Sequence, residues 1–202
     1  MRRRRAKLVE RLAVLVMVGV LSGLLFGWWV SMTLSQPLVD AIYQGNVARV
    51  RILLDRGASP NSSGRTADHL DDEDGPTPAL VLAAQYGRTD IATLLLARGA
   101  NVNTRDDLQT TPLMEAAWRG HTATVRVLLT YGANVSAMPN WGAYTALHGA
   151  ADEGHTDVVR LLLEHGAETD LRDGHGETPL TLARTHHHED IVRLLRNAGA
   201  KE

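Results

Sequence analysis

The dipeptide Gly-Ala recurs along the chain at a nearly constant interval. It begins at Gly57, Gly99, Gly132, Gly166 and Gly199. The last three steps are 33, 34 and 33 residues (99 to 132, 132 to 166, 166 to 199). A period of this length indicates a solenoid, in which similar supersecondary units stack in a row. Such a stack presents one long surface without an enclosed catalytic cavity, which favours the binding of other macromolecules.

Composition excludes several classes of function. The chain has 202 residues, enough for one ordinary domain, and its formal net charge of −2 offers no bulk attraction to nucleic acid. It contains no cysteine, which excludes disulfides, thiolate metal sites and a cysteine nucleophile. Only one phenylalanine is present, so the core is expected to be aliphatic and rich in alanine.

An uncharged run of 23 residues occupies positions 12–34 (Leu12 to Leu34). As a helix it would span roughly 35 Å at about 1.5 Å per residue, enough to cross a hydrocarbon core of about 30 Å. Residues 1–11 are rich in arginine, whereas the next basic residue after the run is Arg49. The positive-inside rule therefore predicts a single-pass anchor with a cytoplasmic leader at 1–11 and the remaining chain exported.

Two further interpretations concern this apolar run. It could be a cleaved signal peptide, although it is longer than the usual apolar region and lacks an Ala-x-Ala site before Gln36. Small residues also recur every fourth position at Gly19, Gly23, Gly27 and Ser31. That stripe would let two membrane helices approach closely and form a homodimer, but glycine is also simply common in membrane helices.

Two segments display the repeated unit most completely. Residues 110–135 read TTPLMEAAWRGHTATVRVLLTYGANV, and residues 145–169 read TALHGAADEGHTDVVRLLLEHGAET. Both resemble the ankyrin repeat, with its Thr-Pro-Leu-His turn, Ala-Ala pair, Gly-His step and final Gly-Ala. The resemblance implies an all-α solenoid of helix-turn-helix repeats with β-hairpin-like finger loops. It covers residues 37–202, with repeats at about 37–61, 75–103, 106–136, 140–170 and 173–202.

The residues of the third unit suit this architecture on physical grounds. Thr111 is a good helix N-cap, and Pro112 fits the first turn, where its missing N–H has no partner. Gly120 and Gly132 are expected to end the two helices in the left-handed conformation. In the last repeat His187 stands where the others have the helix-ending glycine.

The first Gly-Ala step differs from the rest, because it covers 42 residues, from Gly57 to Gly99. The excess lies in the polar segment 62–76, which predicts an extended finger loop. The acidic stretch from Asp71 to Asp74 invites a calcium site, but consecutive carboxylates do not match a Ca²⁺ loop, in which the ligands alternate.

Other candidate chemistry is weak. Among nine histidines, the resemblance assigns structural positions to His121, His148 and His155. The run at residues 186–188 is expected to point its side chains in different directions around a helix rather than toward one metal. The carboxylates of Asp152 and Glu153 are expected at an exposed helix start. No nucleophile elbow, phosphate loop or zinc-protease motif occurs, so the sequence predicts no enzyme activity, no metal and no cofactor.

Large aromatic side chains gather at positions that face the concave surface and the finger tips in ankyrin proteins. Tyrosine, tryptophan and arginine together are typical of binding hot spots. The predicted partner-binding residues are Tyr43, Tyr86, Trp118, Arg119, Trp141, Tyr144, Asp152 and Glu153. Alternatively, one or two of these rings only pack against the next finger.

The sequence therefore predicts a membrane-tethered scaffold that binds a partner protein through its concave face. An exported array behind a signal anchor favours a bacterial inner membrane, with the array in the periplasm. Two alternatives stay open: an inhibitor or immunity-type protein that blocks one enzyme, and a secreted binder if the leader is cleaved.

Overall fold

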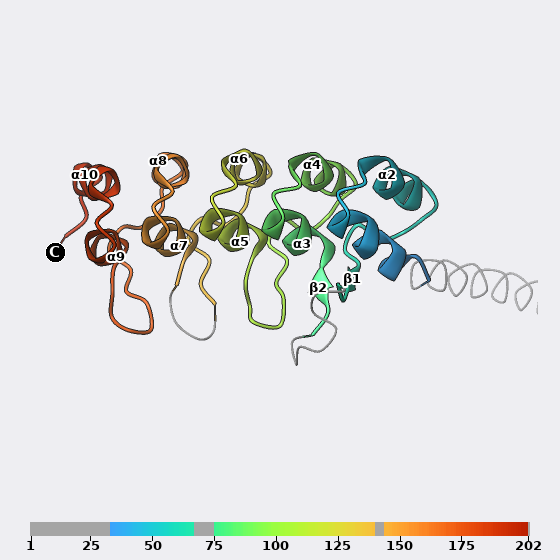
Figure 1. The fold of residues 1–202 in the computed structure, drawn as a ribbon, viewed down its shortest axis with the longest axis horizontal. Coiled ribbons are helices and arrows are strands. Elements are labelled where there is room, and N and C mark those ends of the chain that lie inside the picture. Colours follow the sequence, from blue (N-terminus) through green and yellow to red (C-terminus); the bar gives the residue numbers. More distant parts are fainter. Residues whose placement is uncertain (1–32, 67–74, 140–143, 202) are drawn as a thin grey trace, which may run out of the picture.

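The computed structural model describes residues 33–66, 75–139 and 144–201, and within them the chain forms two parallel rows of helices (Figure 1). The inner row holds the helical residues 33–43, then α3 (Ala79–Gln85), α5 (Pro112–Trp118), α7 (Ala146–Asp152) and α9 (Pro179–Thr185). The outer row holds α2 (Val47–Asp55), α4 (Thr89–Ala97), α6 (Thr122–Thr130), α8 (Thr156–Glu164) and α10 (Glu189–Asn197). Long loops extend from the inner row on the side away from the outer row, and we call these loops the fingers. The expected helical solenoid is present.

Threonine caps start three of the inner helices. The hydroxyl oxygens of Thr111, Thr145 and Thr178 accept hydrogen bonds from backbone N–H groups one turn ahead, at 3.3, 3.5 and 3.2 Å. Glycines follow the ends of α5 and α6: Gly120 and Gly132 have φ values of 72° and 81°, as the sequence predicts.

The core lies between the two rows. The Ala-Ala pairs of α3, α5 and α7 are completely buried, and so are four leucines of the outer row, Leu95, Leu128, Leu162 and Leu195. Alanine lets the inner helices pack closely, while the leucines fill the space between the rows. Neighbouring inner helices contact one another along the whole stack (α3 with α5, α5 with α7, α7 with α9), so the core is continuous.

A polar contact links each repeat to the one before it. His121, His155 and His188 precede the outer helices, and their Nε2 atoms lie 3.0, 3.0 and 2.9 Å from the carbonyl oxygens of Gln85, Trp118 and Asp152. Arg88 takes the same position one repeat earlier and donates to the Tyr43 carbonyl at 3.2 Å. These carbonyls end the preceding inner helices, where helix groups lack internal partners.

Glycine is required beneath each of these rings. A Cβ atom added to Gly87, Gly120 or Gly154 would lie 2.7, 2.5 or 2.6 Å from the histidine ring of the next repeat. Each of these glycines thus makes room for the histidine ring of the next repeat, and this contact helps to set the spacing between repeats.

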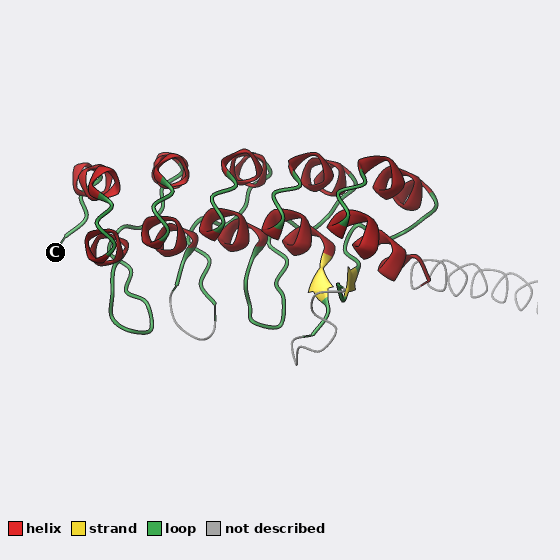
Figure 2. Cartoon of the chain, in the orientation of Figure 1, coloured by secondary structure: helices red, strands yellow, loops and turns green. Residues whose placement is uncertain are grey.

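The first finger contains a short strand pair in the described residues (Figure 2). β1 (Ser63–Gly64) runs antiparallel to β2 (Thr77–Pro78), with Ser63 opposite Pro78. The side-chain amide of Gln36 fastens this finger to the first inner helix, because it donates to the Arg65 carbonyl at 2.7 Å and accepts from the Arg65 N–H at 3.3 Å.

Several sequence predictions fall on residues outside the described ranges. These are the leader at 1–11, nearly all of the apolar run at 12–34 with Gly19, Gly23 and Gly27, the acidic stretch at 71–74, and Trp141. At the described end of the run, residues 33–43 are helical and Leu34 packs against the core. Among the described helices, none is both long and apolar enough to cross a bilayer.

Candidate functional site

A groove of about 510 Å³ lies over α5 and α7 and between the fingers of the third, fourth and fifth repeats. We call it the acidic groove. Apolar side chains in its wall are Leu108, Met114, Trp118, Pro139 and Tyr144. Four carboxylates line it as well: Glu115, Asp152, Glu153 and Asp173. Thr110, Thr145, Gly149, Gly174 and His175 complete the lining.

Trp118 is the most prominent side chain of the groove. It is the last residue of α5 and is 44% exposed, which is unusual for tryptophan. Its indole Nε1 donates to Glu153 Oε1 at 3.0 Å, and the Arg119 guanidinium carbon lies 5.1 Å from the ring centroid. The ring is therefore held in place by the following repeat while much of its surface faces solvent.

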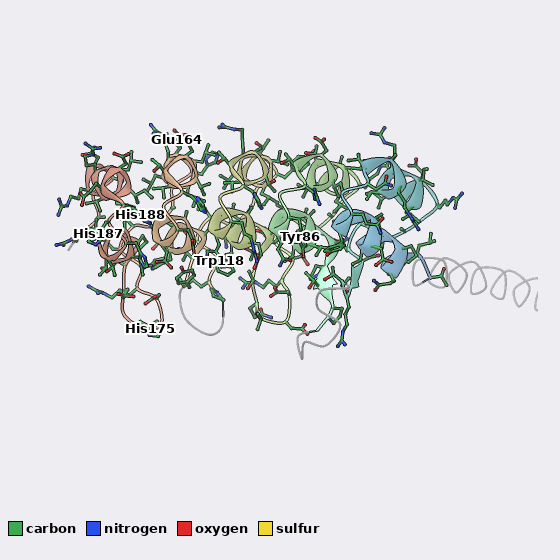
Figure 3. The ribbon with its side chains drawn as sticks, in the orientation of Figure 1. Tyr86, Trp118, Glu164, His175, His187 and His188 are labelled. Carbon is green, nitrogen blue, oxygen red and sulfur yellow. The ribbon has the colours of Figure 1, made fainter. Side chains whose placement is uncertain are left out.

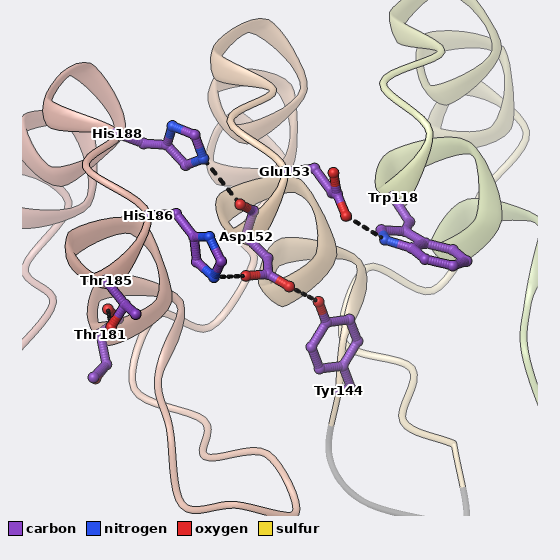
Figure 4. Close-up of polar contacts among 8 residues, drawn as sticks. All are labelled: Trp118, Tyr144, Asp152, Glu153, Thr181, Thr185, His186 and His188. Atoms are coloured by element: carbon purple, nitrogen blue, oxygen red, sulfur yellow. Dashed lines mark hydrogen bonds and ion pairs between the residues drawn. The ribbon is translucent and has the colours of Figure 1, made fainter.

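Asp152 connects the fourth and fifth repeats (Figure 4). Its Oδ2 accepts a hydrogen bond from the Tyr144 hydroxyl at 2.8 Å, and its Oδ1 lies 3.0 Å from His186 Nε2. Its backbone carbonyl lies 2.9 Å from His188 Nε2. One aspartate thus positions a tyrosine on the groove wall and two histidines of the next repeat.

The position of Asp152 and Glu153 corrects a sequence prediction. They lie at the C-terminal end of α7, as its last residue and its C-cap, and not at a helix start. The helix dipole is unfavourable for a carboxylate there. Hydrogen bonds from Tyr144 and Trp118 offset part of this cost.

The histidine run is also arranged differently from the prediction. Residues 186–188 form the turn between α9 and α10, with His187 at a φ of 60°. His186 and His188 stack with ring centroids 6.1 Å apart and both approach Asp152, so they converge. In the ranges that the structure describes, no group of three or more histidine, aspartate or glutamate side chains could hold a metal ion.

Burial disfavours negative charge on two side chains of the groove, Glu115 and Tyr144. Burial raises the pKa of the Glu115 carboxyl, and the nearby Arg119 guanidinium only partly opposes this effect. Burial also raises the pKa of the Tyr144 phenol. The hydrogen bond to Asp152 and the negative charge of that carboxylate raise it further. Tyr144 therefore stays protonated and donates to Asp152 at any physiological pH.

Seven of the eight predicted partner-binding residues lie in the described ranges, and the structure divides them into two groups. Trp118, Tyr144, Asp152 and Glu153 line the acidic groove, and Arg119 lies beside it. Tyr43 and Tyr86 instead form an edge-on pair in the first two repeats, with centroids 5.3 Å apart and planes at 87°. Figure 3 shows Tyr86 and Trp118 on different inner helices. The remaining residue, Trp141, is one of those not described.

The predicted partner-binding residues did not include five residues that shape the groove: Leu108, Met114, Glu115, Pro139 and Asp173. A signal existed for Leu108, an apolar residue within a polar finger segment, and it is 51% exposed. Glu115 had no such signal, because a lone glutamate in a helix looks like a solvated surface residue.

His148 has a structural position in this region. It is fully buried, and its Nε2 lies 3.0 Å from the Leu171 carbonyl oxygen of the next finger. Its Nδ1 accepts the Thr145 backbone N–H at 3.2 Å, so Nε2 carries the proton and donates to Leu171. Burial lowers the pKa of this imidazole, which keeps it neutral.

Comparison with known proteins places this architecture in a family. The model for ankyrin repeats (3 copies) matches residues 38–139 and 138–202. An ankyrin repeat protein from Rickettsia bellii (strain RML369-C) is 30% identical over 94 residues, 39% of each chain. The 2-5A-dependent ribonuclease of Mus musculus is 40% identical over 75 residues, which cover 37% of this chain and 9% of that protein. The chain thus spans well under half the length of the curated relatives it matches. The repeats, their caps and the family match together show that this chain belongs to the ankyrin-repeat family.

Proposed function

We propose that this protein is a scaffold that binds a partner protein at the acidic groove. Ankyrin repeats are generally protein–protein interaction modules. The observation that carries the proposal is Trp118, a large aromatic ring fixed by Glu153 yet 44% exposed beside a groove of about 510 Å³. Exposed, rigidly held tryptophan next to tyrosine and arginine is the usual composition of a binding hot spot.

The pre-organisation of the groove supports this proposal. Glu153, Asp152 and the Tyr144 hydroxyl fix the surrounding side chains before any partner arrives. Arg105 Nη1 also donates to the carbonyls of Gln109 and Met138, both at 2.9 Å, and so ties the third finger to the fourth. A surface that is already ordered loses little conformational entropy on binding.

The location of the scaffold is part of the same proposal. The uncharged run at 12–34 behind an arginine-rich leader supports a single-pass anchor, with the N-terminus in the cytoplasm and the array outside it. In a bacterium the array would lie in the periplasm. A second copy of the chain could join through Gly19, Gly23 and Gly27.

Affinity capture with matched variants tests the binding site. Cross-linked extracts of the source organism are captured on the full chain, on Trp118→Ala and on Tyr131→Ala. Tyr131 is a suitable control because it is an aromatic residue with similar exposure, 43%, at the end of the outer helix α6. The proposal expects a partner that the wild-type chain and Tyr131→Ala retain and that Trp118→Ala loses.

The same capture experiment can contradict the proposal. A partner that all three chains retain equally would place the binding surface elsewhere. Circular dichroism of Trp118→Ala must match the wild-type spectrum, so that a lost partner reflects the missing ring and not an unfolded repeat.

A further inference from the structure

We propose that the acidic groove receives an arginine side chain from an extended segment of the partner protein. This inference rests on the proposed function and specifies the chemistry of its partner. The volume of the groove, about 510 Å³, leaves room for a long side chain together with its neighbours in the segment.

Charge in the groove selects a cation. Four carboxylates line it, and the C-terminal end of α7 adds the negative end of a helix dipole at Asp152 and Glu153. Two of these carboxylates have nearby basic groups, because Arg119 Nε lies 3.7 Å from Glu115 Oε2 and His186 contacts Asp152. Glu153 and Asp173 carry further negative charge, so an acidic ligand would meet repulsion and a basic one attraction.

Glu115 gives an independent reason for a cation. Its side chain is 15% exposed, and within the described ranges its Oε2 atom is shielded from solvent without a hydrogen-bond partner. Its ion-pair partner is Arg119, whose Nε lies 3.7 Å from that oxygen and therefore pairs with it only loosely. Burial of an incompletely paired carboxylate is costly, and a second cation in the groove would offset that cost.

The apolar wall explains why the cation belongs to a side chain. Leu108, Met114 and Pro139 offer carbon surface next to the carboxylates. Basic side chains match such a surface, because their methylene stem packs on apolar groups while the charged head reaches polar ones. A free metal ion or a small ammonium ion would leave this wall uncovered.

Trp118 favours arginine over lysine. A guanidinium group stacks on an indole face and can bond a carboxylate through two parallel N–H groups. The ring already accepts such a group within the chain, since the Arg119 guanidinium lies 5.1 Å from its centroid. Arg119 itself is nearly half exposed, so an arginine of the partner can share or replace this contact.

Selection from a random-peptide display library tests the inference. The full chain in detergent micelles is the bait, and binders that also bind Trp118→Ala are removed. Peptides that depend on Trp118 are expected to be enriched in arginine beside apolar residues. Synthetic copies with citrulline, which has the shape of arginine without its charge, should bind about tenfold more weakly. Copies with lysine should be intermediate.

Variants of the chain test the same inference by changing the charge of the groove. Glu153→Gln keeps an acceptor for the Trp118 N–H and removes one charge, and it should weaken the selected peptides about fivefold. Glu164→Gln removes one charge from the exposed end of α8, in the outer row (Figure 3), and should leave their affinity unchanged.

The outcomes separate this inference from the proposed function. Peptides that depend on Trp118 but lack arginine, or that bind equally well with citrulline, overturn the arginine site and leave a protein-binding groove. Failure to obtain any Trp118-dependent peptide also overturns it, whereas the proposed function is decided separately by the capture experiment.

Discussion

His187 adopts a backbone conformation that the equivalent residues of the other repeats reach without strain. Its φ is 60°, in the left-handed region, where Gly45, Gly87, Gly120 and Gly154 stand in the preceding repeats. A side chain in this region costs on the order of 1 kcal/mol. Histidine fits here sterically because its side chain is exposed, whereas a Cβ atom on Gly154 would collide with the His188 ring.

Replacement of His187 by glycine is therefore expected to stabilise the protein. His187→Gly should raise the free energy of unfolding by about 0.5–1 kcal/mol, because it removes the strain at a modest cost in chain entropy. Urea denaturation followed by circular dichroism measures this change. As a control, His165→Gly acts at a φ of −98° and should lower stability. If both variants lose stability, the left-handed conformation of His187 carries no strain.

His148 makes stability depend on pH. Because burial lowers the pKa of its imidazole in the folded protein, the unfolded chain binds the proton first as the pH falls. The neutral imidazole stabilises the fold fully at pH values above 6.5, which is its pKa in the unfolded chain. This stabilisation is lost as the pH falls from 6.5 through the lower pKa of His148 in the folded protein. His148→Gln should be less stable than the wild type above pH 6.5 and should lose less stability below it.

Urea midpoints of the two proteins on either side of pH 6.5 check this expectation. The two proteins differ only at this position, so the difference between the two pH dependences isolates His148. Identical pH dependences would mean that His148 is not held neutral by the fold.

At the scale of the elements, the histidines before α6, α8 and α10 couple neighbouring repeats. His155 shows this most clearly, because it contacts the carbonyl of Trp118, the residue that dominates the groove. The interaction therefore joins the stacking of the third and fourth repeats to the position of the binding surface.

Loss of this coupling should be measurable. His155→Ala is expected to lower the free energy of unfolding by about 1–3 kcal/mol, since it leaves the Trp118 carbonyl without its partner across the repeats. His165→Ala is the control, because the His165 ring contacts the Leu161 carbonyl of its own helix, and it should cost under about 1 kcal/mol. Equal losses in denaturant titrations would refute the coupling.

Element boundaries were largely predictable because they depend on local residues. Thr111 and Gly120 determine where α5 begins and ends through short-range geometry, and both act as the sequence indicates. The expected place of His187 at the helix-ending position is confirmed by its φ of 60°. The expectation that residues 186–188 point their side chains apart around a helix was wrong, because the turn that they form brings the rings of His186 and His188 together.

At the scale of the whole molecule, the repeat period predicts the stack of helical repeats, but it does not predict the acidic groove. The acidic groove combines side chains from three fingers and two inner helices, and its shape depends on contacts such as that between Arg105 and Met138, 33 residues apart. The resemblance to ankyrin repeats placed Trp118, Tyr144, Asp152 and Glu153 on one binding surface, and in the structure these four residues line one groove. The resemblance gave no reason to separate them from Tyr43 and Tyr86.

Site-specific photo-crosslinking tests the binding surface most directly. Benzoylphenylalanine replaces Leu108, an exposed apolar residue of the groove wall, in one full-length chain and Tyr131 in another, and each is illuminated in cells of the source organism. The account expects a specific adduct with a partner protein from position 108 and none from position 131. Adducts of the same partner from position 131 alone, or from both positions equally, would contradict a binding site at the acidic groove.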